Sequence, residues 1–292
     1  MNNLMQRVLV GLIGIPAAVG VVWVGGLTFN LVIMAITTIA LWEFYQLSAS
    51  KNAETNMIGG IMWSLVLQSI VSGIVMAHSF YALNWLLALL AVFVIGVTVM
   101  LAAEMWRNKP NALVNVTLTI AGVAYVTLCL STLMVLRDVT EPEFRGTISE
   151  TGGALVLALF GSVWACDSVA YFVGMSIGKH KIFPRVSPKK SWEGSIAGAI
   201  GAVAAFWGFS TLWMPDMTMT TIVVVGLIIG IGGQIGDFAE SWLKRDAVIK
   251  DSSSILPGHG GVLDRFDSML FVAPLVWAYI VLRQVVASNF GG

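Results

Sequence analysis

Residues 81–102 read YALNWLLALLAVFVIGVTVMLA, 22 consecutive positions without a charged side chain. A helix needs about 20 such residues to cross the roughly 30 Å hydrocarbon core of a bilayer. Inside that core, backbone amides have to be hydrogen-bonded within the segment, which favours a helix over an open strand. This stretch therefore predicts a membrane-spanning helix.

Comparable apolar runs lie on both sides of it, which gives nine predicted spans: 8–24, 27–47, 58–76, 81–102, 113–136, 153–177, 195–213, 220–240 and 268–287. Of the 292 residues, 57% are hydrophobic and 11% are charged, whereas a soluble domain carries about a quarter charged residues. We therefore expect an all-α, polytopic membrane helix bundle of about nine transmembrane helices. Five spans would form an N-terminal bundle over 1–150, and four would form a C-terminal bundle over 151–292.

The charges of the loops predict the orientation of this bundle. Sixteen Lys and Arg balance sixteen Asp and Glu, so net charge says nothing about an acidic partner. We expect no nucleic acid to bind. With a cytosolic N-terminus, thirteen basic residues fall on the cytosolic side and three, Arg137, Arg145 and Arg283, on the other. Such a bias over short loops is the positive-inside signal. It places the two long polar loops, 178–194 and 241–267, together on the cytosolic side.

The eighth span ends in polar residues that share one helical face. Asp237, Ser241 and Lys244 stand at i, i+4 and i+7, so they present a carboxylate, a hydroxyl and an amine in file. Asp237 lies about one turn inside the predicted boundary, where an ionisable group is costly unless it is paired, hydrated or bound to a metal. Either it is functional, or it bridges to Lys244 or Arg245 at the membrane surface.

A glycine-rich turn, PGHGG, follows at residues 257–261. Its glycines at 258, 260 and 261 let backbone amides approach an anion at the start of the last span. The alternative is a tight turn with no ligand. His259, between two of these glycines, either contacts a phosphate, acts as an acid or base, or is merely solvated.

Two carboxylates come directly after this turn. Asp264 and Asp267 are spaced i and i+3, so they are neighbours on one face of a helix. Together with Asp237 they supply oxygen ligands of the kind that Mg²⁺ takes. The alternative is that they are helix N-terminal charges favoured by the helix dipole.

The loop 178–194 holds five basic residues, and its sequence ends in SPKKSWEG. Lys189 and Lys190 follow Ser187 at the entrance of a span, where the phosphate of a lipid would lie. A weaker interpretation is general attraction to anionic headgroups, worth about 1 kcal/mol per charge. Asp167, about midway through the sixth predicted span, needs a cation, a polar partner or water.

Two blocks of this sequence resemble one known family. Segment 241–267, SWLKRDAVIKDSSSILPGHGGVLDRFD, is similar to the signature of the phosphatidate cytidylyltransferase family in its elements S-x-x-K-R, K-D and H-G-G-x-x-D-R-x-D. Segment 167–194 resembles the same family in D-S-V-A-Y-F-V-G, G-K-H-K and S-P-K-K-S-W-E-G. The resemblance covers about residues 160–270, and Ser191 stands where the family pattern leads us to expect Thr. The N-terminal half matches only in being hydrophobic.

The resemblance implies a membrane enzyme that converts CTP and phosphatidic acid to CDP-diacylglycerol and pyrophosphate with Mg²⁺ as cofactor. In that case the catalytic residues would be Asp237, Ser241, Lys244, His259 and Asp264. The metal would be held by Asp237 and Asp264, with Asp267 as a third ligand. Substrate contacts would come from Asp167, Ser187, Lys189, Lys190, Arg245, Lys250, Gly260, Gly261 and Arg265.

Other functions stay open at this point. An ether-lipid cytidylyltransferase or a polyprenol-type CTP-dependent kinase would use the same blocks, because lipid tails touch only apolar helix surface. A secondary transporter would use ionisable residues inside spans as an ion path. The resemblance also implies a location in the bacterial inner membrane with the active site facing the cytosol. The sequence leaves the oligomeric state open, with a homodimer as one alternative.

Overall fold

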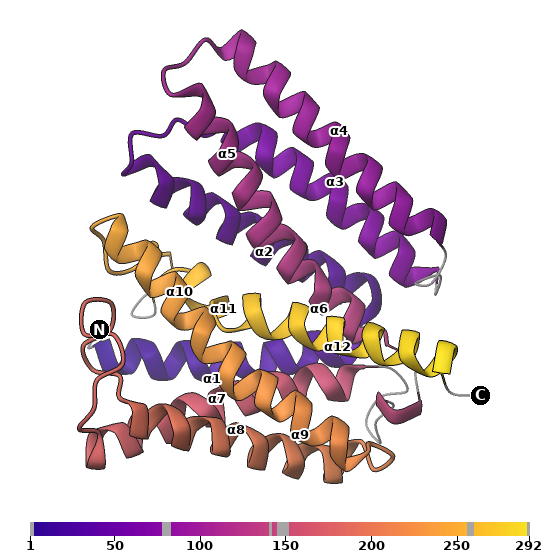
Figure 1. Ribbon diagram of the computed structural model, residues 1–292, viewed down its shortest axis with the longest axis vertical. Coiled ribbons are helices and arrows are strands. Elements are labelled where there is room, and N and C mark those ends of the chain that lie inside the picture. The colour runs from indigo at the N-terminus through magenta and orange to yellow at the C-terminus, as the bar shows by residue number, and fades with distance from the viewer. Residues whose placement is uncertain (1–2, 78–82, 140–141, 145–151, 256–259, 291–292) are drawn as a thin grey trace. The chain divides into compact units, whose positions relative to one another are not determined.

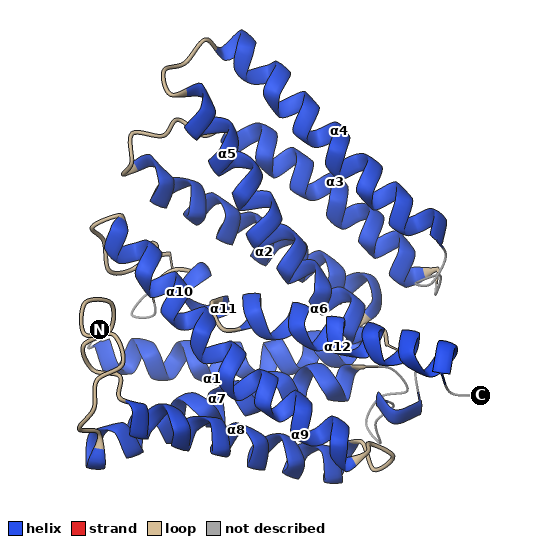
Figure 2. Cartoon of the chain, viewed as in Figure 1, coloured by secondary structure: helices blue, strands red, loops and turns tan. Residues whose placement is uncertain are grey.

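The computed structural model describes residues 3–77, 83–139, 142–144, 152–255 and 260–290. Over these residues the chain is built of helices and contains no strand (Figure 2). In chain order the α-helices are α1 (Asn3–Val24), α2 (Gly26–Ala49), α3 (Met57–Met76), α4 (Leu83–Arg107), α5 (Ala112–Gly122), α6 (Cys129–Arg137), α7 (Gly153–Ile177), α8 (Trp192–Trp213), α9 (Met219–Leu227), α10 (Gly233–Asp246), α11 (Leu263–Phe266) and α12 (Met269–Phe290).

The predicted all-α membrane bundle is confirmed. Within the described residues, eight helical stretches are long and apolar enough to cross a membrane: 26–49, 57–76, 86–107, 112–137, 153–177, 192–213, 219–246 and 263–288. The remaining predicted span, 8–24, falls in helix α1, where only the side chains from Gly11 onward are described. The stretches 112–137 and 219–246 are each one continuous helix that contains a π-helical turn. These turns are η1 (Val123–Leu128), between α5 and α6, and η3 (Ile228–Gly232), between α9 and α10.

The helices form two compact units that alternate along the sequence. The first unit comprises residues 1–135 and 243–266, and the second comprises residues 136–242 and 267–292. The sequence predicted a division near residue 150, whereas these units group the segment after the eighth span with the N-terminal helices.

Polar side chains inside the first unit form hydrogen bonds between helices. Asn30 on α2 donates to Ser72 on α3 at 2.8 Å, and Gln68 on α3 donates to Thr37 on α2 at 2.9 Å. All four side chains are buried. Such bonds inside a membrane contribute about 0.6 kcal/mol each on average, so they specify which faces meet more than they stabilise the unit.

Small residues set the packing of the second unit, in which α8 lies along both α7 and α9 (Figure 1). A Cβ added at Gly198 of α8 would lie 2.9 Å from both the Cβ of Ala170 and the carbonyl oxygen of Cys166 on α7. One added at Gly230 of η3 would lie 2.7 Å from the Cα of Ala199 on α8. Glycine is therefore required for the backbones to approach this closely.

Candidate active site

A polar pocket of about 690 Å³ lies within the second unit, among α7, the loop before α8, α8 itself and α10. Its lining includes five residues predicted as site residues: Asp167, Ser187, Lys189, Lys190 and Asp237. The structure thus brings together residues from the block 167–194 and from the end of the eighth predicted span.

An ion pair lies in this pocket, between the Lys190 ammonium and the Asp237 carboxylate. The Lys190 Nζ also lies 4.3 Å from the ring centroid of Phe238, close enough for a cation–π contact. Ser241 donates to the other Asp237 oxygen at 3.3 Å. Asp167, on α7, interacts electrostatically with both members of the pair. Two carboxylates and an ammonium therefore share one pocket, which three membrane-spanning helices and the loop before α8 form.

A second charged cluster belongs to the first unit. Lys244 Nζ donates to Asp264 Oδ1 at 2.7 Å, and the two side chains are only 11% and 8% exposed. Asp264 also accepts from the backbone amides of Ser252, at 3.0 Å, and Gly261, at 2.8 Å. Lys244 therefore pairs with Asp264. The alternative from the sequence, in which Asp237 bridges to Lys244 or Arg245, joins residues of the two units and stays a prediction.

The two described glycines of the turn are needed for packing inside this cluster. Gly260 has φ +78°, and a Cβ there would lie 2.6 Å from Asp264 Oδ2. A Cβ on Gly261 would lie 1.9 Å from Ser252 Oγ. The Gly261 amide already donates to Asp264, so its predicted contact with a triphosphate stays a prediction that requires this amide to change partner.

Sequence reasoning missed a fully buried carboxylate, Glu43 of helix α2. One of its oxygens accepts from Ser253 Oγ at 2.5 Å and from the Val262 amide at 3.0 Å. The other accepts from Ser252 Oγ at 3.1 Å and from the Leu263 amide at 2.6 Å. Glu43 thus connects helix α2 with residues 252–253 and 262–263 of segment 241–267. A lone ionisable residue inside a predicted span was the signal that would have found it.

Three predicted basic residues of the signature segment lie on the surface: Arg245, Lys250 and Arg265. Arg245 donates to the carbonyl oxygen of Ile249 at 3.1 Å, which holds the end of α10. Their exposure makes these cations accessible to an incoming anion.

The predicted metal ligands are spread over both units. Asp237 and Asp267 belong to the second unit and Asp264 to the first. Asp267 accepts from the Ser268 amide at 2.6 Å, directly before helix α12. Within each unit, the described residues include no group of three or more His, Cys, Asp or Glu side chains that could hold a metal ion. His259 lies outside the described residues.

Membrane-spanning helices around a pocket lined by lysines and carboxylates define an integral membrane protein with a charged pocket among its helices. The chain belongs to the cytidylyltransferase family, whose pattern it matches over residues 5–283. A phosphatidate cytidylyltransferase of Brucella abortus biovar 1 (strain 9-941) is 33% identical over 96% of this chain and 94% of its own. Those of Bacillus subtilis (strain 168) and Synechocystis sp. are each 30% identical over 97% of this chain and 99% of their own.

Proposed function

We propose that the chain transfers the cytidylyl group of CTP to the phosphate of phosphatidic acid, which yields CDP-diacylglycerol and pyrophosphate. Family membership over nearly the whole chain supports this reaction, as do relatives that carry the name phosphatidate cytidylyltransferase. The observation that carries the proposal is the pocket of the second unit. In it Lys189 and Lys190 lie beside Asp167 and Asp237 within a set of membrane-spanning helices.

In this reaction a phosphate oxygen of the lipid attacks the α-phosphorus of CTP in line, and pyrophosphate leaves. The attacking phosphate is already ionised near neutral pH, so the site needs no strong general base. It has to position two anions and neutralise their charge. We assign Lys189 and Lys190 to the lipid phosphate. Lys190 then exchanges Asp237 for that phosphate, and Asp237 becomes available to a cation.

The residues of the pocket fit the magnesium ion that the family resemblance implied. Mg²⁺ is usually bound by one or two carboxylates together with substrate phosphates and water, and the pocket contains two carboxylates, Asp167 and Asp237. Ser241 orients Asp237 through its hydrogen bond. When bound, the metal would neutralise charge that develops on the α-phosphate and the leaving group. Ligation by Asp264 and Asp267 stays a prediction.

The signature segment is assigned to the nucleotide. Arg245, Lys250 and Arg265 are exposed cations of the right sign for a triphosphate. Lys244 and Asp264 hold each other at low exposure, so their role in this proposal is to keep the segment folded as the nucleotide binds. A catalytic role for His259, and contacts of Gly260 and Gly261 with the nucleotide, stay predictions.

The test is an assay of the purified protein in mixed micelles with CTP, phosphatidic acid and Mg²⁺, with pyrophosphate and labelled lipid as readouts. Asp237→Asn should lower kcat by about 100-fold or more, because removing one preorganised electrostatic contact costs that much. Lys190→Ala should chiefly raise the KM for phosphatidic acid, about tenfold for a lost charge-assisted hydrogen bond. Chelation of Mg²⁺ should stop turnover. Normal kcat in the Asp237 variant would remove that residue from the mechanism.

The same assay separates the other functions. A polyprenol-type kinase would release CDP in place of pyrophosphate, and an ether-lipid enzyme would prefer ether-linked phosphatidate in a substrate panel. A transporter would support flux in proteoliposomes without a CTP-dependent product.

We also propose a location in the bacterial cytoplasmic membrane with the pocket open to the cytosol, where CTP is present. The excess of basic residues in the loops of one side and the bacterial relatives support this placement. We expect no nucleic-acid partner. A homodimer stays a prediction, which light scattering of the detergent-solubilised protein checks.

A further inference from the structure

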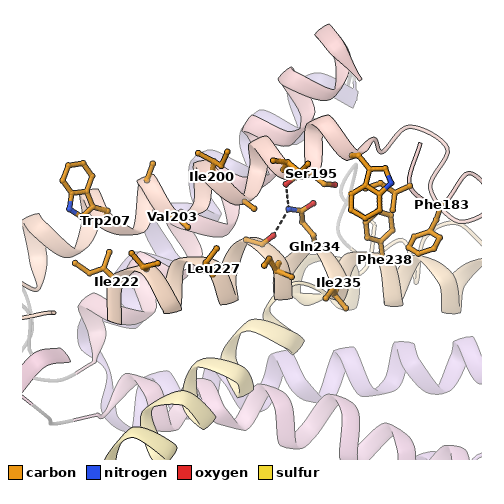
Figure 3. A pocket seen from close by; sticks show the side chains of 18 of the residues that line it. Phe183, Ser195, Ile200, Val203, Trp207, Ile222, Leu227, Gln234, Ile235 and Phe238 are labelled. Atoms are coloured by element: carbon orange, nitrogen blue, oxygen red, sulfur yellow. Dashed lines mark hydrogen bonds between the residues drawn. The ribbon is translucent and has the colours of Figure 1, made fainter. Parts of the chain in front are cut away.

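An apolar groove of about 790 Å³ runs along the second unit between α8 and the continuous helix α9–η3–α10 (Figure 3). Nearly all of its lining is hydrocarbon, including Ile196, Ile200, Val203, Leu227, Ile231 and Ile235. Most of these side chains are substantially exposed: Ile200 is 65% and Ile231 53% exposed. In a membrane such a surface meets lipid chains, so by itself the groove identifies no particular ligand.

The groove and the polar pocket share part of their walls. Ser195 and Gln234 line both. The Gln234 amide donates to the carbonyl oxygens of Ser195, at 2.9 Å, and Gly230, at 2.7 Å, so it bridges the two helices at the boundary (Figure 3). Phe238 lines the groove at this end, and the Lys190 ammonium lies over its ring. An apolar path thus begins beside the cation assigned to the lipid phosphate.

The length of the groove matches the depth of one leaflet. Figure 3 shows Phe183 and Phe238 at one end of it and Trp207 with Ile222 at the other. From Ser195 to Trp207, α8 rises about 18 Å at 1.5 Å per residue. Half of a hydrocarbon core of roughly 30 Å is about 15 Å. A lipid with its headgroup at Lys190 would therefore run a chain along the groove to Trp207.

We propose that this groove binds one acyl chain of the lipid substrate while Lys189 and Lys190 hold the phosphate. The inference rests on the proposed function and adds to it a chain-binding site. Its occupant is an acyl chain attached to a phosphate, because only such a ligand fills the apolar path and the cationic pocket at once. Ile200 and Leu227, halfway along, are then residues that determine how well long chains are used.

The test compares Ile200→Trp, which fills the groove, with Leu212→Trp on the same helix. Leu212 is 70% exposed and lies outside the groove lining, so its variant adds the same bulk to α8 without entering the groove. The kcat/KM of each purified variant is measured for a long-chain and a short-chain phosphatidic acid. Ile200→Trp should lower the long-to-short ratio about tenfold, the cost of excluding a methylene or two from an apolar pocket. Leu212→Trp should leave the ratio as in the wild type.

An unchanged ratio in Ile200→Trp, with the short-chain substrate still converted, would overturn the groove while leaving the proposed reaction intact. Absence of product from the wild type with both lipids would overturn the reaction instead. The groove is then judged by labelling alone, with phosphatidic acid that carries a diazirine on its acyl chain. Labelling of α8 should be displaced by phosphatidic acid but not by phosphatidylcholine. Equal displacement by both lipids would assign the groove to bulk lipid. A change of oligomeric state in Ile200→Trp would assign it to a second copy of the chain.

Discussion

Each oxygen of the Glu43 carboxylate accepts one hydroxyl and one backbone amide. The hydroxyls of Ser252 and Ser253 can rotate, but the amides of Val262 and Leu263 cannot turn to accept. A glutamine in this place would point its NH₂ group at one of those amides in either orientation. The negative charge itself is therefore not the only requirement, because two acceptors facing two fixed donors are needed.

Glu43→Gln should accordingly lower kcat about tenfold at temperatures below its melting point, because an unsatisfied buried donor costs about 1–3 kcal/mol and moves the segment that carries Asp264. The matched control is Glu54→Gln in the same unit, since Glu54 pairs with Lys109 at the surface and is 47% exposed. We expect the control to keep kcat within about twofold, as exposed pairs contribute little. Wild-type kcat and melting temperature in Glu43→Gln would show that the loop does not depend on this carboxylate.

A second carboxylate, Glu143, leads to a prediction about the free energy of unfolding. Burial by itself would raise its pKa, but hydrogen bonds from Thr221 and Thr218 and the ion pair with Arg283 outweigh burial and hold the pKa below its ordinary value of 4.5. A pKa lowered by folding stabilises the protein above the unfolded value, and this contribution disappears as the pH falls through the folded pKa.

Glu143→Gln should therefore lower the melting temperature in detergent at neutral pH, and its difference from the wild type should shrink as the pH falls below about 4.5. Loss of helicity on heating, followed by circular dichroism at several pH values, measures this. A difference that stays constant over that range would mean that ionisation of Glu143 makes no contribution.

At the scale of elements, hydropathy predicted most helices because length and polarity are local properties of the chain. The start of α8 differed: the predicted span began at 195, whereas the helix begins at Trp192, with Ser191 as a cap that accepts from the Gly194 amide at 3.3 Å. That cap was readable from the sequence. The π-helical turns were not, because an extra residue in a turn is tolerated only where neighbouring helices accommodate it.

The candidate site was predicted in its members better than in its pairings. Asp167 and Asp237 stood out because ionisable groups inside spans are few. Their neighbour Lys190 came from a loop 47 positions before Asp237 in the sequence, and only the packing of α7, α8 and α10 brings them into one pocket. Spacing along one helix offered Lys244 as a partner of Asp237, but it could not indicate the pair between Lys244 and Asp264, which lie 20 positions apart.

Because α7 and α8 both line that pocket, their contact can be tested with one side chain. Gly198→Val should lower both activity, about tenfold or more, and the melting temperature, since its Cβ meets the fixed carbonyl oxygen of Cys166 and overpacking costs about 1–3 kcal/mol. A Cβ added at Gly208 on the same helix would meet nothing within 4 Å, so Gly208→Val should behave as the wild type. Equal activity of the two variants would show that activity does not depend on the contact between α7 and α8 at Gly198.

At the scale of the whole molecule, loops that the sequence assigns to the same side of the membrane contact one another within each unit. In the first unit Lys51 pairs with Asp246 at 2.8 Å, and Asn111 donates to the carbonyl oxygen of Asn52 at 3.3 Å, so three loops assigned to the cytosol gather at one end. In the second unit Glu143 bonds to Thr218 and pairs with Arg283, all assigned to the opposite side. Within each unit the contacts thus join loops that the distribution of charge assigns to one side of the membrane, and which side is cytosolic stays a prediction.

This agreement leads to a prediction about orientation. A thiol introduced by Lys51→Cys should react with a membrane-impermeant maleimide in inverted vesicles and not in intact cells, because the positive-inside bias places that loop in the cytosol. Asp216→Cys, an exposed position between α8 and α9, should give the reverse pattern. The unmodified chain is the blank, since Cys166 is buried and Cys129 lies within a membrane-spanning stretch. If Lys51→Cys were labelled from outside the cell and Asp216→Cys from within, the polar pocket would face away from cytosolic CTP, and the proposed reaction would lose its nucleotide supply.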